Sequence, residues 1–131
     1  MRIPQIVFTT GLVVLALLLL SPRHHPYAYN TNTEARIQGV VQEVEEFYCP
    51  VTGEIGTHLE VATEKGTVQV HVAPSRFLHG KQWKFTKGDR VEIIGAPISI
   101  QGRQGLVARI VTDGPEVVAV RQESGKPLWV E

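Results

Sequence analysis

The stretch "KGDRVEIIGAPISIQGRQGLVARIV", residues 87–111, indicates the fold class because apolar and polar residues alternate in it twice. Such alternation is typical of two strands that each bury one face. Glycines near the ends of both segments favour turns and bulges over a long helix. We expect a turn at Lys87-Gly88-Asp89 and then a strand with two side chains inward and two outward, namely Val91 and Ile93 against Arg90 and Glu92.

The second half of the stretch predicts a fifth strand with Leu106, Ala108 and Ile110 inward and Arg109 outward. Similar alternation recurs in "RIQGVVQEVEE" (36–46), "HLEVATE" (58–64), "TVQVHVA" (67–73) and "EVVAVRQ" (116–122). The one helical segment, "PSRFLHGKQWKF" (74–85), begins at Pro74-Ser75 and is interrupted by Gly80.

Three strands, a short helical link and two or three further strands follow the order of an OB-fold barrel. The predicted fold class is therefore all-β: a five- to six-stranded OB-fold-like Greek-key barrel with one short helix, preceded by an N-terminal hydrophobic helix. In such a barrel Gly39 eases the bend of a long first strand.

Lys65-Gly66 has the length and chemistry of a two-residue hairpin turn between the second and third strands. The register that follows places Thr63 opposite Val68, Val61 opposite Val70, and Leu59 opposite Val72. All the apolar side chains then share one face. The other face, with Glu60 opposite His71, is expected to be solvated.

An apolar run at residues 6–20 follows Arg2 and ends at Ser21-Pro22. It predicts a signal peptide or membrane anchor at 1–21, a linker at 22–35 and the OB-fold-like domain at 36–131. The run is shorter than the roughly 20 residues that cross a bilayer, which favours a signal peptide. No clean cleavage site follows, so an anchor remains an alternative, and a buried core helix is a third. Either main reading exports the domain, to the periplasm or to the outer side of the cytoplasmic membrane.

The charge balance argues against general nucleic-acid binding. The chain has 13 basic and 13 acidic residues, and residues 1–30 hold two arginines and no acid, which leaves 11 basic against 13 acidic residues in the rest. A slightly acidic domain gains little from phosphate neutralisation. The single cysteine, Cys49, excludes an internal disulfide.

Three ordered segments, "HVAPSRF" (71–77), "KGDRVEIIG" (87–95) and "GKPLW" (125–129), resemble a family of small exported bacterial OB-fold domains described as nucleic-acid-binding-like. The chain is also similar to the carboxyl-terminal domain of some magnetosome-associated proteins. The resemblance covers about residues 36–129. It implies a fold and a compartment, and it implies no catalytic residue.

One candidate site is a metal site. His58, Glu60 and His71 are expected to project from one sheet face, and Cys49 lies nine residues before His58 across a loop that can fold back. Two imidazoles, a carboxylate and a thiolate suit zinc or copper. The alternative is a solvated face on which a histidine and a glutamate make a weak cross-strand pair. In the linker, His24 and His25 are either incidental or ligands of a metal or haem.

The other candidate is a surface for an anion. Basic residues alternate with aromatic ones between residues 76 and 90, which is how OB-folds hold single strands, although such aromatics also cap the end of a barrel. The residues are Arg76, Phe77, Lys81, Trp83, Lys84, Lys87 and Arg90.

No nucleophile elbow or P-loop is present, so an enzyme is not expected. The predicted function is an exported, non-enzymatic binding or scaffold module for a protein or a small anionic ligand, with no cofactor. The alternatives are a metal- or haem-handling accessory protein and a protein that binds single-stranded nucleic acid, although nucleic acid is an unlikely partner for an exported acidic domain.

Overall fold

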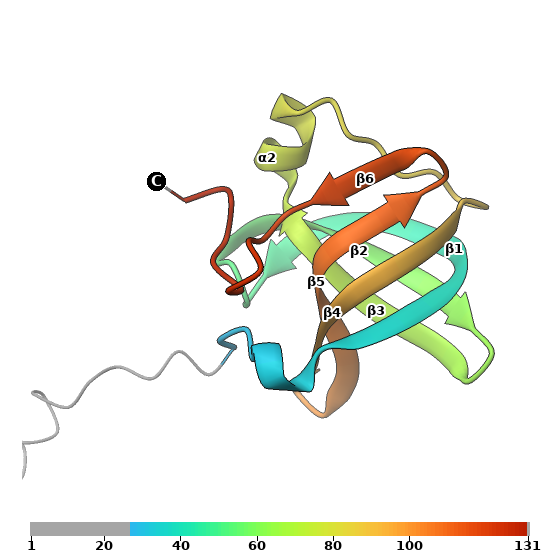
Figure 1. Ribbon diagram of the computed structural model, residues 1–131, viewed down its shortest axis with the longest axis horizontal. Helices are drawn as coiled ribbons and strands as arrows, with labels where there is room; N and C mark the ends of the chain where they lie inside the picture. Colours follow the sequence, from blue (N-terminus) through green and yellow to red (C-terminus); the bar gives the residue numbers. More distant parts are fainter. Residues whose placement is uncertain (1–26, 131) are drawn as a thin grey trace, which may run out of the picture.

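Six strands, one short α-helix and one 3-10 turn make up the computed structural model, which describes residues 27–130 (Figure 1). The predicted hydrophobic helix, the signal peptide or anchor at 1–21, and His24 and His25 lie outside the described residues. Within residues 27–130, no helix is long and apolar enough to cross a membrane. The elements are η1 (Thr31–Thr33), β1 (Ala35–Cys49), β2 (Glu54–Thr63), β3 (Gly66–Pro74), α2 (Ser75–Gly80), β4 (Arg90–Ile100), β5 (Arg103–Asp113) and β6 (Glu116–Ala119).

Strand β1 organises the barrel because it pairs with two different strands. Its first part, to Val40, pairs antiparallel with β4, and its second part, from Val40, pairs antiparallel with β2. The change of partner occurs beside Gly39, where an added Cβ would lie 2.2 Å from the carbonyl oxygen of Ala62. A side chain at this position would therefore collide with the neighbouring backbone, which confirms the predicted role of Gly39 in the bend.

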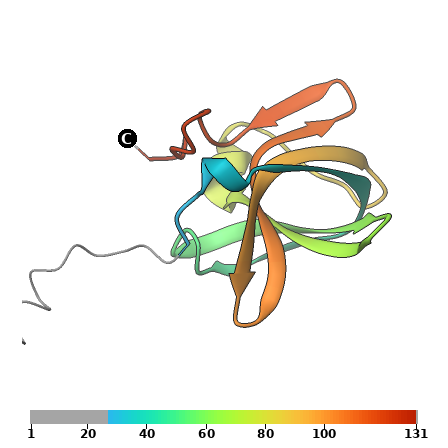
Figure 2. The same ribbon diagram turned by 60° about the horizontal axis from the view of Figure 1, so that its bottom comes forward.

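The sheet runs in the order β3-β2-β1-β4-β5-β6 and closes through parallel pairing of β3 with β5. The helix α2 lies between β3 and β4 in the chain and covers one end of the barrel (Figures 1 and 2). This connectivity is that of an OB-fold barrel with an additional sixth strand, as the sequence predicts.

The barrel interior is a continuous apolar core. Its buried members come from all six strands, from α2 and from the segments that follow α2 and β6: Val41, Leu59, Val61, Val70, Val72, Ala73, Leu78, Phe85, Val91, Ile93, Leu106, Ala108, Val111, Val118 and Val120. The inward positions predicted for β4 are confirmed. The prediction for Ile110 is wrong, because a register shift between Ile94 and Gly95 leaves Arg109 unpaired with β4 and turns Val111 inward instead.

The predicted register of the β2–β3 hairpin is wrong by two residues. Thr63 pairs with Gly66, and Glu64 and Lys65 form the turn. The Thr63 hydroxyl donates to the Gly66 carbonyl at 2.7 Å and accepts from the Lys65 amide at 3.2 Å, which fixes the tighter loop. A shift of two keeps every side chain on its face, so the apolar residues still point inward.

Candidate metal centre

A second, smaller apolar cluster lies on the outer side of the barrel wall. Cys49, Val51 and Val107 are buried in it, and Tyr27, Tyr29, Ile98 and Ile100 pack around them. Because side chains alternate along a strand, Val70 and Leu106 point into the barrel while their neighbours His71 and Val107 point outward. Residues on the outside of β2 and β3 are thereby covered at this end.

Three residues that commonly bind metals meet at this cluster. The ligand atoms of Cys49, His58 and His71 all lie within 4.8 Å of one another. The Cys49 sulfur is 3.5 Å from Nδ1 of His71, and the two imidazole ring centres are 4.7 Å apart, edge to face. The three residues are 2%, 1% and 6% exposed, so the group is buried, and His71 also lines a surface pocket of about 550 Å³.

Local structure explains how the three side chains converge. His58 and His71 are directly paired across β2 and β3, so both project from the same face. Cys49 ends β1 and pairs with Glu54 across the turn that follows, where the Gly53 amide donates to the Cys49 carbonyl at 2.8 Å. Gly56 lies between the two segments, since a Cβ there would stand 3.1 Å from the Cys49 Cβ and 3.6 Å from Cε1 of His58.

His58 is a buried polar side chain with unused bonding capacity. Neither Nδ1 nor Nε2 makes a hydrogen bond of normal geometry among the described residues, although the Gly56 backbone lies close enough to act on the pKa of the ring. The ring stacks on Phe47 at a centroid distance of 3.7 Å and an angle of 7°. Buried polar groups are nearly always paired, so an imidazole with two free nitrogens in an apolar setting calls for an explanation.

Both histidines are held neutral. Burial, and secondarily the neighbouring His71 ring, lower the pKa of His58 to about 4, and the Gly56 backbone opposes this only in part. Burial, and then the charge of Arg103, lower the pKa of His71 to about 4. A neutral imidazole has a lone pair available for a metal, so at neutral pH both rings have the protonation state that metal binding requires.

Two sequence-based expectations about this face are wrong. Glu60 pairs with Gln69 and not with His71, and its carboxylate accepts from Arg103 at 2.6 Å and from Gln69 at 3.4 Å. It therefore does not join the cysteine and the histidines. The face is also not solvated at His58 and His71, because Phe47 and the outer cluster cover it.

Arg121 borders the cluster and was not predicted from the sequence. It is 7% exposed and lines one small cavity together with Cys49, His71 and Trp129. The other buried side-chain atom without a hydrogen-bond partner in residues 27–130, besides the two nitrogens of His58, is its Nε. Arg121 belongs to the alternating segment 116–122, but that pattern does not mark it as a buried cation, and strand β6 ends before it, at Ala119.

The basic and aromatic residues of the predicted anion surface are partly engaged elsewhere. Arg76 donates two hydrogen bonds to the Glu54 carboxylate, at 2.6 and 3.1 Å. Lys87 lies 3.9 Å from Glu43, and Lys81 lies 6.0 Å from the Phe77 ring.

The aromatic residues of the same region cap the barrel. Phe77 packs against Trp83 and Trp129 at ring distances of 6.0 and 6.1 Å, and Phe85 is buried in the main core. Lys84 lies beside Trp83 and Phe85 on a groove of about 460 Å³.

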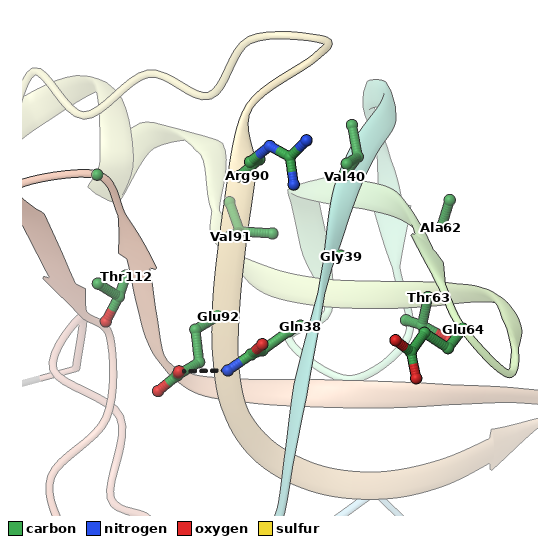
Figure 3. A pocket seen from close by; sticks show the side chains of 11 residues that line it. Gln38, Gly39, Val40, Ala62, Thr63, Glu64, Arg90, Val91, Glu92 and Thr112 are labelled. Atoms are coloured by element: carbon green, nitrogen blue, oxygen red, sulfur yellow. Dashed lines mark hydrogen bonds between the residues drawn. The ribbon is translucent and has the colours of Figure 1, made fainter.

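Arg90 does not line the groove of Trp83 and Lys84. It lies at a pocket of about 430 Å³ where β1 crosses from β4 to β2, lined also by Gly39 and Glu64 (Figure 3). On the same pocket, Gln38 donates to Glu92 at 3.0 Å. Of the seven predicted residues, Arg90 thus lies on one pocket and Trp83 and Lys84 lie on another.

Comparison with known proteins gives one match at the level of sequence families. None of the curated proteins matches the chain. Among solved structures, the mitochondrial single-stranded DNA-binding protein Rim1 of S. cerevisiae aligns with a TM-score of 0.46 and 13% identity, over 65% of this chain and 93% of that one. The N-terminal domain of PriB from Thermoanaerobacter tencongensis aligns with a TM-score of 0.46 and 22% identity, over 65% and 99%.

The family match covers most of the barrel. Residues 33–118 match the model of the MamS/MamX magnetosome protein family. The matched residues extend from just before β1 into β6. The resemblance to magnetosome-associated proteins noted in the sequence is thereby confirmed. The chain belongs to the MamS/MamX magnetosome protein family.

Proposed function

We propose that this chain is a magnetosome-associated, non-enzymatic module that binds one transition-metal ion through Cys49, His58 and His71. The observation that carries the proposal is the convergence of a thiol and two imidazoles, with ligand atoms within 4.8 Å of one another, in a buried pocket. The family supports the magnetosome association. Export through residues 1–21 is part of the same proposal.

The distances suit a single ion. With metal–sulfur and metal–nitrogen bonds of about 2.3 and 2.0 Å, ligands of one tetrahedral centre lie roughly 3.6 Å apart. The separation of 3.5 Å between the Cys49 sulfur and Nδ1 of His71 is already close to this value. The third ligand, His58, is within 4.8 Å of both, and a side-chain rotation that shortens these separations brings it into the same coordination sphere.

A bare ion fits better than a haem. Haem iron takes protein ligands only at its two axial positions, which lie on opposite sides of the macrocycle. Three ligand atoms that converge on one point instead match a trigonal or tetrahedral centre. The neutral state of both histidines favours binding, because no proton must leave either ring.

The test is metal stoichiometry on the purified full chain. We expect one Cu(I) or Zn(II) per chain in equilibrium dialysis under reducing conditions, measured by elemental analysis. Cys49→Ser, His58→Leu and His71→Leu should each lower the bound metal to less than a tenth at the same free concentration. His79→Ala is the matched control, because His79 is exposed and pairs with Glu46 outside the cluster. Unchanged binding in the three variants would refute the proposal.

A second candidate function is binding of a protein or small anionic ligand at the groove beside Trp83. One observation favours it: Lys84 lies on this groove, and within residues 27–130 it makes no ion pair. Lys84→Glu should then abolish capture of the partner from membrane extracts without changing metal content. Retained capture would exclude this groove.

A further inference from the structure

A buried arginine stands beside the proposed metal ligands. Arg121 lines the same cavity as Cys49 and His71, which has a volume of only about 10 Å³. The cavity has room for one water molecule at most, so the guanidinium has no hydration shell. The charge of Arg121 therefore acts on the Cys49 and His71 side chains with little solvent between them.

Arg121 lacks a carboxylate partner. Its Nη1 donates to the Gly125 carbonyl at 2.9 Å, and its guanidinium carbon lies 5.2 Å from the Tyr29 ring centre and 4.9 Å from that of Trp129. No aspartate or glutamate of residues 27–130 lies within 4.0 Å of it. A buried, unneutralised cation is costly, so its retention at this cavity indicates a role.

The other groups around Arg121 are consistent with an electrostatic interaction between Arg121 and Cys49. Burial lowers the pKa of Arg121, while the charges of Tyr29 and Cys49 act in the opposite direction. Tyr29 is itself held protonated: its hydroxyl donates to Glu34 at 2.6 Å, and burial followed by that contact raises its pKa. Cys49 is therefore the neighbour able to supply a negative charge, and it does so once its thiol proton is replaced by a metal.

Building on the proposed function, we propose that Arg121 is a selectivity-determining residue that makes the Cys49–His58–His71 centre prefer monovalent copper over divalent zinc. When Cu⁺ replaces the thiol proton, one positive charge enters the pocket and one leaves as H⁺. The buried charge beside Arg121 is then unchanged. Zn²⁺ in the same exchange adds one positive charge beside an arginine that has no counter-ion.

The ligand set points in the same direction. The centre offers three ligands, and no fourth cysteine, histidine or carboxylate in residues 27–130 joins them. Structural zinc sites are almost always four-coordinate, whereas a thiolate ligand is soft and suits Cu(I).

The experiment measures the affinity of each metal separately on the full chain under anaerobic conditions. Cu(I) is titrated against bicinchoninate and Zn(II) against 4-(2-pyridylazo)resorcinol, for the unmodified chain and for Arg121→Gln. We expect the variant to gain about tenfold or more in Zn(II) affinity and to keep its Cu(I) affinity within about threefold. Arg36→Gln is the matched control, because Arg36 is exposed and paired with Glu92 away from the cluster, and it should change neither affinity by more than about threefold.

Each outcome has a distinct meaning. If neither metal binds the unmodified chain, the proposed function fails. If both bind and Arg121→Gln leaves Zn(II) affinity unchanged, metal binding stands and the role of Arg121 is refuted. Arg121→Lys keeps the charge and should keep the discrimination, which provides a second reading if the Gln variant does not fold. Binding of Zn(II) to the unmodified chain as tightly as Cu(I) would also overturn the inference.

Discussion

The two faces of β2 show how one strand serves two purposes. Its inward side chains, Leu59 and Val61, are fully buried in an apolar core. Its outward side chain His58 is equally buried, yet both of its ring nitrogens lack a partner. The inner face is what a stable barrel requires, whereas the outer face carries an unpaired polar group that stability alone does not explain. This difference is the basis for the proposal that the outer face binds a ligand.

The largest expected effect concerns the inner face. Leu59→Ala should lower the free energy of unfolding of the metal-free protein by about 2–5 kcal/mol, because it leaves a cavity in the main core. Urea denaturation followed by tryptophan fluorescence measures this loss. Val44→Ala on the exposed side of β1 is the control and should cost less than about 1 kcal/mol. Equal losses at the two positions would contradict the assignment of Leu59 to the core.

Acid should lower the free energy of unfolding through the two buried histidines on the outer face of β2 and β3. His58 and His71 have a pKa of about 4 in the fold against the ordinary 6.5, so the unfolded chain takes up protons first as the pH falls. The free energy of unfolding should therefore decrease between pH 6.5 and 4, by about 1.4 kcal/mol per pH unit for each histidine.

Asp113 acts in the opposite direction over much of this range. Burial, and then its contact with Asp89, raise its pKa to about 6, so it takes up its proton in the fold first. Proton uptake by Asp113 should offset the effect of about one histidine on the pH dependence of the free energy of unfolding. Comparison with His58→Leu then isolates the contribution of His58. The variant should lose pH dependence equivalent to one proton in urea titrations of the metal-free protein. An identical pH profile in both proteins would show that His58 is not held neutral by the fold.

Replacing His58 separates stability from binding. His58→Leu should raise the free energy of unfolding of the metal-free protein at pH 7 by about 1–2 kcal/mol, because it removes two buried polar atoms without partners. The same variant should lose metal binding. His79→Ala should change stability by less than about 0.5 kcal/mol. A loss of more than about 1 kcal/mol in His58→Leu, measured by urea denaturation, would mean that His58 stabilises the barrel by itself.

The smallest expected effect is at Gly56, which sets the approach of Cys49 to His58. A Cβ there would contact the Cys49 Cβ at 3.1 Å and the Ala73 carbonyl oxygen at 3.4 Å, so the cysteine must move by a few tenths of an ångström. Gly56→Ala should weaken metal affinity by about tenfold or less in the chelator competition. Gly80→Ala has open space around it and should leave the affinity unchanged. Unaltered affinity in Gly56→Ala would show that the cysteine position is not critical.

The sequence predicted the barrel well because alternation is a local signal. Strand order, the helix after β3 and the inward positions of Val91 and Ile93 all follow from it. The register of β2 and β3 did not, because Thr63 forms a hydroxyl-stabilised turn one residue earlier than the glycine suggests. Because the register differs by two residues, each side chain keeps its predicted face of the sheet and only its cross-strand partner changes.

The candidate site was predicted only in part. Cys49, His58 and His71 were identified as metal-binding types, and the cysteine does fold back to the histidines. Their burial depends on Val107, which reaches the outer cluster only through closure of the barrel. Arg121 lies beyond the end of β6, and its position at the cavity depends on tertiary packing that the alternation in residues 116–122 does not predict. Glu60 was misplaced because the register that put it opposite His71 was wrong.

The most direct test of the central claim is X-ray absorption spectroscopy of the metal-loaded full chain. The account predicts one sulfur ligand at about 2.3 Å and two imidazole nitrogens at about 2.0 Å, with the sulfur lost in Cys49→Ser. A spectrum with only nitrogen and oxygen ligands, or one that Cys49→Ser leaves unchanged, would contradict it.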